Sequence, residues 1–159
     1  MMEYRNDSVR RQDRLLGEKR ARELLRGGEY GFLAMASDEG GYGIPVNYVA
    51  EGDTIYIHCA PEGRKLRAIA ADARVSFCVV GVTRPVPERF TTAYESIVVS
   101  GRARVVVSDD ERRHALELLV GKYAPDYAAV GEKYIDKSFH RTAVIAIDAE
   151  WWSGKTKRV

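Results

Sequence analysis

Residues 56–65 read Tyr-Ile-His-Cys-Ala-Pro-Glu-Gly-Arg-Lys, and this stretch is the most informative one for both the fold and the site. Its pattern is that of a strand end, a loop that contains Gly63, and a helix that opens on Arg64 and Lys65. A junction of this kind leaves backbone N–H groups free at the helix start, where the helix dipole attracts an anion. The two cations beside it predict a cradle for one phosphate group. The alternative is a solvated helix face that also includes Arg67, because runs of charge usually lie at the surface.

The segments on either side predict mostly strands. Apolar and alternating runs predict strands over 30–36, 44–49, 54–59, 74–82, 94–107 and 142–147, with a bend or bulge at Gly101. Amphipathic patterns predict helices over 17–26, 62–71, 108–123 and 126–136. These elements do not alternate regularly, which argues against a parallel doubly wound sheet. We therefore expect a mainly β fold, an antiparallel β-barrel with peripheral helices.

Three local signals refine this expectation. Gly27 and Gly28 should end the first helix, because glycine readily adopts the left-handed cap conformation. The run 108–111, Ser-Asp-Asp-Glu, fits a capping box in which the serine oxygen and the glutamate carboxylate each accept from an amide. Residues 83–92 contain two prolines and are expected to form a loop.

Length and composition exclude several classes of protein. The 159 residues suit one domain, which we expect over 15–159, preceded by an N-terminal arm over 1–14. The net charge of +2 is too small for a surface that binds nucleic acid, and both chain ends are expected to be solvated tails. No apolar run is long enough for a membrane span or a secretory signal, and the 2 cysteines suit a reducing cytoplasm. The 3 histidines show no metal-ligand spacing, so no metal site is expected.

His58 is the first candidate for chemistry. On a strand it shares a face with Tyr56 and Ala60, while Cys59 points the other way. His58 is thereby expected beside whatever the phosphate cradle anchors. The alternative is a packed core histidine.

The run Pro45-Val46-Asn47 indicates an edge strand, because proline cannot donate to a ladder. Free backbone groups on such a strand can hydrogen-bond a planar heterocycle, although a plain edge strand is equally compatible with the pattern. Trp151 and Trp152 are adjacent, so they face opposite sides of an extended chain. One can pack on the barrel while the other stacks on a ligand or a partner.

Six motifs, in this order and spacing, resemble the nitroimidazole-resistance (Nim-type) proteins of the pyridoxamine 5′-phosphate oxidase-like, FMN-binding split-barrel superfamily. They are V-R-R-Q-D-R at 9–14, E-Y-G-F-L-A-M at 29–35, I-P-V-N-Y-V at 44–49, Y-I-H-C-A-P-E-G-R-K-L at 56–66, Y-E-S-I-V-V-S-G-R-A at 94–103 and W-S-G-K at 152–155. The resemblance covers nearly the whole chain. It implies an antiparallel Greek-key split barrel that forms a homodimer with FMN sites at the subunit interface.

The resemblance also implies roles for individual residues. Arg64 and Lys65 match the phosphate clamp, and His58 matches the histidine beside the flavin. The residues implied to contact the cofactor are Pro45, Val46, Asn47, His58, Cys59, Ala60, Gly63, Arg64 and Lys65, with Tyr94, Ser96 and Trp152 approaching from the interface side. Cys59 stands where the family usually carries serine or glycine.

The function that follows is an FMN-dependent oxidoreductase that reduces nitroaromatic or other small electron-poor compounds with electrons from NADH or NADPH. In this interpretation His58 positions the substrate or donates a proton to it. One alternative is a flavin-binding or flavin-sequestering protein without catalysis. Another is the same barrel with haem or a deazaflavin, in which His58 is a candidate iron ligand.

Overall fold

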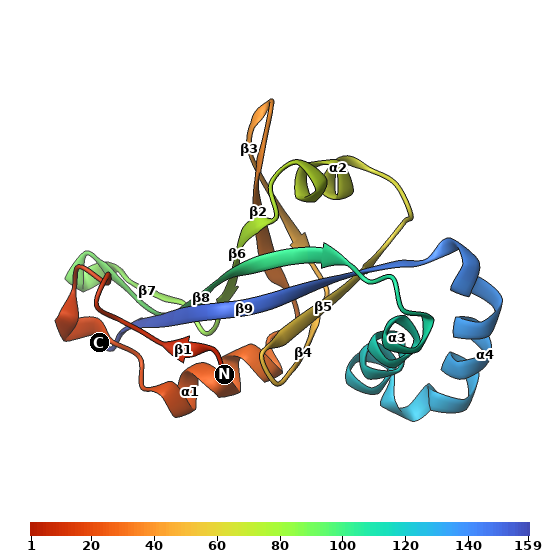
Figure 1. Cartoon of the computed structure of the whole chain (residues 1–159). Coiled ribbons are helices and arrows are strands. Elements are labelled where there is room, and N and C mark those ends of the chain that lie inside the picture. Colours follow the sequence, from red (N-terminus) through yellow and green to blue (C-terminus); the bar gives the residue numbers. More distant parts are fainter.

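A computed structural model describes all of residues 1–159 (Figure 1). The strands are β1 (Glu3–Tyr4), β2 (Gly31–Ser37), β3 (Gly40–Val46), β4 (Val49–Glu51), β5 (Thr54–Cys59), β6 (Arg74–Val80), β7 (Arg84–Val86), β8 (Thr91–Val105) and β9 (Ala143–Lys157). The α-helices are α1 (Glu18–Gly27), α2 (Arg64–Ala71), α3 (Asp109–Tyr123) and α4 (Ala128–Ser138). None of these helices has the length and apolar character that a membrane crossing needs.

Most strands belong to one antiparallel sheet in the order β3-β2-β6-β8-β9-β5-β4. Several neighbours in this sheet, such as β2 and β6, are distant in sequence, as Greek-key crossovers require. The sheet is not closed: its edge strands β3 and β4 are linked by Asn47 and Tyr48 in the chain and do not pair with each other. The predicted antiparallel barrel with peripheral helices is confirmed, as a barrel that is split between β3 and β4.

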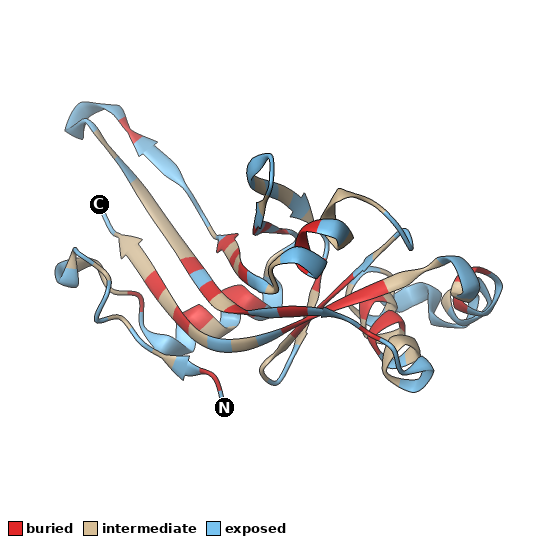
Figure 2. Cartoon of the chain, turned by 45° about the horizontal axis from the view of Figure 1, so that its top comes forward, coloured by how far each residue is buried: buried red, intermediate tan, exposed pale blue.

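The main core fills the inside of this split barrel. Fully buried side chains such as Phe77 and Ile97 project inward from the sheet. Helices α1 and α2 cover the barrel from opposite sides and add Leu24 and Ile69 to the same core (Figure 1). A second core lies between the α3–α4 hairpin and the outer face of β5 and β9, and Tyr56 belongs to it. Figure 2 shows buried residues along the long strands and on the inner sides of the helices.

The long strands β8 and β9 run the length of the molecule, with the α3–α4 hairpin at one end and the β7–β8 hairpin at the other (Figure 1). Their register shifts between Ser100 and Gly101, which is the irregularity predicted at that glycine. A Cβ atom on Gly101 would lie 2.3 Å from the carbonyl oxygen of Asp148. The crossing of the two strands therefore requires glycine at this position.

Residues 83–92 are not a loop, contrary to the prediction. Arg84–Val86 form β7, which pairs with the start of β8, and a short 3-10 turn joins the two strands. Pro85 is tolerated because β7 is an edge strand and needs fewer donors. The tip residue Phe90 has a φ of 48°, an uncommon conformation for a residue with a side chain.

The C-terminal residues are also ordered differently from the expectation. Residues 150–155 continue β9, which ends at Lys157, and Trp152 and Gly154 are buried in it. The N-terminal segment covers this half of the strand, because Tyr4 pairs with Trp152 in the parallel β1–β9 ladder. Neither end of the chain is a solvated tail over these residues.

Three smaller expectations need correction. Gly28 caps α1 at a φ of −60°, so no left-handed cap requires glycine at this position. Packing requires it instead, because a Cβ atom on Gly28 would lie 2.5 Å from the Tyr48 hydroxyl oxygen. The strand expected from residue 44 already begins at Gly40 and stops at Val46. At the start of α3, Ser108 accepts from the Glu111 amide, but the Glu111 carboxylate binds elsewhere, so only half of the capping box forms.

Candidate functional site

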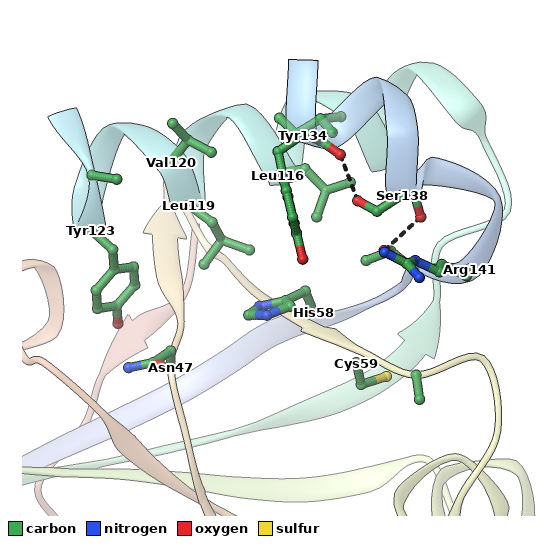
Figure 3. A pocket seen from close by; sticks show the side chains of 14 residues that line it. Asn47, His58, Cys59, Leu116, Leu119, Val120, Tyr123, Tyr134, Ser138 and Arg141 are labelled. Carbon is green, nitrogen blue, oxygen red and sulfur yellow. Dashed lines mark hydrogen bonds between the residues drawn. The ribbon is translucent and has the colours of Figure 1, made fainter. Parts of the chain in front are cut away.

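A hollow of about 560 Å³ opens between the end of β5 and the α3–α4 hairpin (Figure 3). Its walls are mostly apolar, and its few polar groups come from β5, from the β3–β4 link and from the end of α4. The lining residues are Asn47, His58, Cys59, Ala60, Leu116, Leu119, Val120, Tyr123, Ala124, Tyr134, Ile135, Ser138, Arg141 and Thr142. A concave, largely apolar cavity with a few convergent polar groups is typical of a site for a small organic molecule.

His58 occupies the floor of this hollow. It lies on β5 opposite Val144 of β9, and its side chain points toward α3 and α4 (Figure 3). The shared face with Tyr56 is confirmed, because Tyr56 packs in the helical core while Ile57 packs inside the barrel. The surrounding protein atoms, and then the charge of Lys65, hold the pKa of His58 below its usual value of 6.5. The imidazole is therefore mostly neutral at pH 7, able to accept one hydrogen bond and donate another.

Asn47 borders the same hollow and is held in place by a network at the end of α3. Its side-chain amide donates to the carbonyl oxygen of Glu29 at 3.0 Å, and the Tyr123 hydroxyl donates to the same oxygen at 2.6 Å. The Tyr48 amide donates to the Tyr123 hydroxyl at 3.0 Å, and Lys122 Nζ donates to the Tyr48 carbonyl at 2.9 Å. Helix α3 thus fixes the link between β3 and β4, where the barrel is split.

A second, smaller depression of about 110 Å³ adjoins the hollow at the start of α2. It is lined by Tyr42, Cys59, Ala60, Glu62, Gly63, Arg64, Lys65 and Leu66. Because Cys59 and Ala60 line both cavities, the two meet at the end of β5. Gly63 precedes the helix with a φ of 145°, a conformation that favours glycine. The structure therefore brings the predicted cradle and the predicted histidine together.

Arg64 is the most constrained side chain of the small depression. Its guanidinium lies 4.1 Å from the centre of the Tyr42 ring, and Nη2 lies 3.2 Å from Glu39 Oε2 and 3.4 Å from Ser37 Oγ. Its Nε is buried and has no hydrogen-bond partner. A buried donor of this kind costs about 1–3 kcal/mol while it is unpaired. Arg64, which lines the depression, therefore carries one donor that no protein group satisfies.

Several residues implied by the resemblance lie away from both cavities of this chain. Pro45 is exposed on β3 opposite Phe32, as expected of an edge strand, and Val46 packs against the main core. Tyr94 and Ser96 lie half-buried on β8, toward its other end. Trp152 is fully buried, with its ring 4.8 Å from that of Tyr4, so its indole belongs to the core and does not reach a surface.

The helical walls of the hollow are the part that sequence reasoning missed. Leu116, Leu119 and Val120 lie on the helix predicted over 108–123, but nothing local in the sequence indicates that they face His58. Tyr134 and Arg141, from α4 and the turn after it, carried no signal as site residues. These side chains join the site only through the packing of the α3–α4 hairpin on the sheet.

An open antiparallel barrel that is covered by α1 and α2 and flanked by the α3–α4 hairpin defines a split-barrel protein. The sequence profile of the family described as pyridoxamine 5′-phosphate oxidase matches residues 17–156. The chain belongs to this family, and the resemblance found in the sequence is confirmed at this level. No curated protein matches the sequence significantly.

Solved structures share the fold at low sequence identity. A candidate 5-nitroimidazole antibiotic resistance protein from Bacteroides thetaiotaomicron is 23% identical with a TM-score of 0.77, covering 90% of this chain and 86% of the other. An FAD- and haem-binding protein from Mycobacterium smegmatis is 22% identical with a TM-score of 0.77, covering 90% and 72%. An FAD-binding protein from Mesorhizobium loti is 24% identical with a TM-score of 0.63, covering 91% and 98%.

Proposed function

We propose that the protein is an FMN-binding homodimer, with its FMN sites at the subunit interface, that reduces nitroaromatic or other small electron-poor compounds. One observation carries the cofactor: the buried Nε of Arg64 lacks a partner beside a depression of about 110 Å³. A depression of this size suits a single phosphate group, which favours FMN over a dinucleotide.

The residues around the depression fit a phosphate. Arg64 can offer Nε and Nη2 together, Lys65 adds a second charge, and the start of α2 adds its amides. Glu39, whose side chain is 76% exposed, pairs with Arg64 at 3.2 Å and can be displaced by a more highly charged anion. Glu62 also lines the depression, but it is exposed and its carboxylate can turn to solvent.

The adjoining hollow fits the remainder of a flavin and a substrate. The flavin, when bound, supplies the transfer of electrons from NADH or NADPH to an acceptor. The chain's own residues would hold the ligand and shield it from water. Leu116 and Leu119 exclude water from the hollow, and the hydrogen bond to the Glu29 carbonyl oxygen holds Asn47 at its rim. His58 is able to orient a polar group of the substrate or to exchange a proton with it.

The outer face of the sheet supports the dimer. Phe32, Cys78 and Val98 stand side by side across β2, β6 and β8 on that face. Phe32 is 42% exposed and Val98 is 37% exposed, in the middle of a broad sheet. An apolar row of this kind on a sheet surface is suited to the core of an interface between subunits.

Haem is the second candidate ligand, because the Mycobacterium smegmatis relative binds both FAD and haem. His58 is the one histidine that lines the hollow and thus the candidate iron ligand. A flavin-binding protein without catalysis is the third candidate.

The absorbance spectrum of the purified protein, followed by mass analysis of the heat-released ligand, tests these alternatives. We expect a flavin spectrum and FMN, with oxidation of NADH or NADPH when a nitroaromatic acceptor is added. A Soret band or FAD alone would overturn the FMN assignment. Stoichiometric FMN without turnover on either nicotinamide would overturn the oxidoreductase and leave the binding protein.

A further inference from the structure

Arg141 is the one charged side chain that lines the hollow, since the other lining residues are apolar or carry neutral polar groups. It lies in η4 (Phe139–Arg141), the 3-10 turn that follows α4. Its side chain extends from that turn into the hollow, and Tyr134 and His58 reach the same space from α4 and β5 (Figure 3). No carboxylate borders the hollow. The cavity therefore holds a positive charge that nothing on its own walls balances.

The backbone around Arg141 is held firmly in place. Arg112 Nη1, on α3, donates to the carbonyl oxygens of Phe139 and Thr142 at 3.1 and 3.0 Å, one on each side of Arg141. The Arg112 guanidinium also lies 3.9 Å from the centre of the Phe139 ring. The Thr142 hydroxyl donates to the carbonyl oxygen of Ser138 at 2.9 Å. Because these contacts fix the turn, the direction in which the Arg141 side chain leaves the backbone is fixed as well.

The guanidinium of Arg141, by contrast, has no partner within the chain. The two arginines of α3 that pack beside the same turn, Arg112 and Arg113, form ion pairs with Asp109 and Asp136. The side chain of Arg141 takes part in no ion pair and no hydrogen bond. A guanidinium presents its N–H donors in a planar fork, which two parallel oxygens satisfy best. The unpaired fork therefore requires a ligand that supplies such a pair of oxygens.

Charge and shape together define that ligand. Lys65, at the start of α2, adds its positive charge near the same end of β5, since this charge acts on His58 and helps to lower its pKa. Two cations and no carboxylate on the walls favour an anion in the hollow. Leu116 and Leu119 favour a flat apolar ring beside that anion. A carboxylate is the small planar anion that matches the arginine fork, so the ligand class is a flat, apolar carboxylic acid.

We infer that Arg141 is a specificity-determining residue that binds the carboxylate of a flat aromatic acid in the hollow beside His58. This inference rests on the proposed function and narrows its substrates to electron-poor aromatic compounds that carry a carboxylate, such as a nitrobenzoate. The carboxylate is bound and not changed, because the electrons go to the nitro group at the other end of the ring. A neutral compound of the same shape leaves the guanidinium unpaired, so the hollow binds it less tightly.

Binding without turnover gives the first test. The protein loaded with FMN is titrated calorimetrically with para-nitrobenzoate and with para-nitrobenzamide, its neutral counterpart. We expect the wild type to bind the acid more tightly, and Arg141→Gln to weaken acid binding by about 5- to 20-fold, the low end for charge-assisted hydrogen bonds because Arg141 is partly exposed. The affinity for the amide should change by less than about 2-fold. Lys137→Gln is the matched control and should leave both affinities unchanged, because Lys137 is an exposed cation in the last turn of α4 that does not line the hollow.

The same titrations on the protein without flavin separate this inference from the proposed function. Equal affinity of the wild type for the acid and the amide, or an equal loss of both in Arg141→Gln, would overturn the inference and leave the FMN-dependent activity standing. A protein that never binds FMN, yet binds the acid in a manner that depends on Arg141, would support the inference and overturn the proposed function.

The second test is kinetic and distinguishes substrate binding from a role at the cofactor. With para-nitrobenzoate as the acceptor, Arg141→Gln should raise the KM by about 5- to 20-fold with little change in kcat, because the carboxylate contact is the same in the ground state and the transition state. Arg141→Lys keeps the charge but loses the planar fork, so its KM should lie between those of the wild type and Arg141→Gln. The FMN affinity should be the same in all three proteins. A weaker FMN affinity in Arg141→Gln would assign the guanidinium to the cofactor and overturn the inference.

Discussion

Replacing Arg64 by alanine tests the phosphate cradle most directly. A phosphate oxygen on Nε and Nη2 would make charge-assisted hydrogen bonds, which contribute about 1.5–3 kcal/mol. The competing ion pair with the exposed Glu39 is worth at most about 1 kcal/mol, so it offsets only part of this gain. We therefore expect Arg64→Ala to weaken FMN binding by about 10- to 100-fold. Folding should change little, because the variant also removes an unpaired buried donor.

Matched variants separate this contribution from a general loss of charge. Arg67, one turn further along α2, is exposed, so Arg67→Ala should change FMN affinity by less than about 3-fold. Glu39→Gln removes the competitor of the phosphate and should tighten binding by about 2- to 5-fold. Arg64→Lys keeps the charge but loses the planar fork, and its affinity should fall between those of the wild type and the alanine variant.

Titration of the apoprotein, followed by quenching of flavin fluorescence, measures these affinities. Riboflavin, which lacks the phosphate, is the decisive control ligand, because Arg64→Ala should not alter its binding. Unchanged FMN affinity in Arg64→Ala would show that the phosphate binds elsewhere. An equal loss for FMN and riboflavin would show that Arg64 supports the pocket and not the phosphate.

Three further outcomes are expected. The pKa of His58 lies below 6.5, so if this residue donates a proton, the turnover of the wild type should rise as the pH falls through that range. The turnover of His58→Ala should be about 10²- to 10⁴-fold lower and should not show this rise. Both rates are measured per bound flavin. Burial lowers the pKa of Lys122 from 10.5 to about 8, so the folded state releases its proton first and the free energy of unfolding should rise from pH 8 to pH 10.5. Urea titrations should show this rise in the wild type relative to Lys122→Met, and an identical pH dependence would contradict it. Gly101→Ala should lower the free energy of unfolding by about 1–3 kcal/mol, because the added Cβ meets a backbone oxygen at 2.3 Å.

The sequence predicted those parts of the fold whose signals are local. The glycine inside the apolar run of β8 indicated the bulge, and the apolar periods indicated α1 to α4 and the central strands. Prediction failed where a distant segment supplies the missing partner. Pro85 indicated a loop, yet residues 84–86 form strand β7 because they pair with the start of β8. Residues 150–155 looked like a polar tail, yet they are a strand because β8 and the N-terminal segment pair with them.

The candidate site likewise has one part with a local sequence signal and one part that depends on distant segments. Gly63, Arg64 and Lys65 are consecutive and follow a recognisable strand after a short loop, so the cradle can be inferred from one short stretch of sequence. The contacts of the Arg64 guanidinium cannot be inferred in this way. They depend on Tyr42 on β3 and on Glu39 in the turn before β3, at the edge of the barrel. The walls of the hollow come from α3 and α4, and these helices lie beside β5 only because the α3–α4 hairpin packs on the sheet. A local sequence signal can therefore indicate a candidate phosphate cradle, whereas the shape of the space beside it is set by tertiary packing.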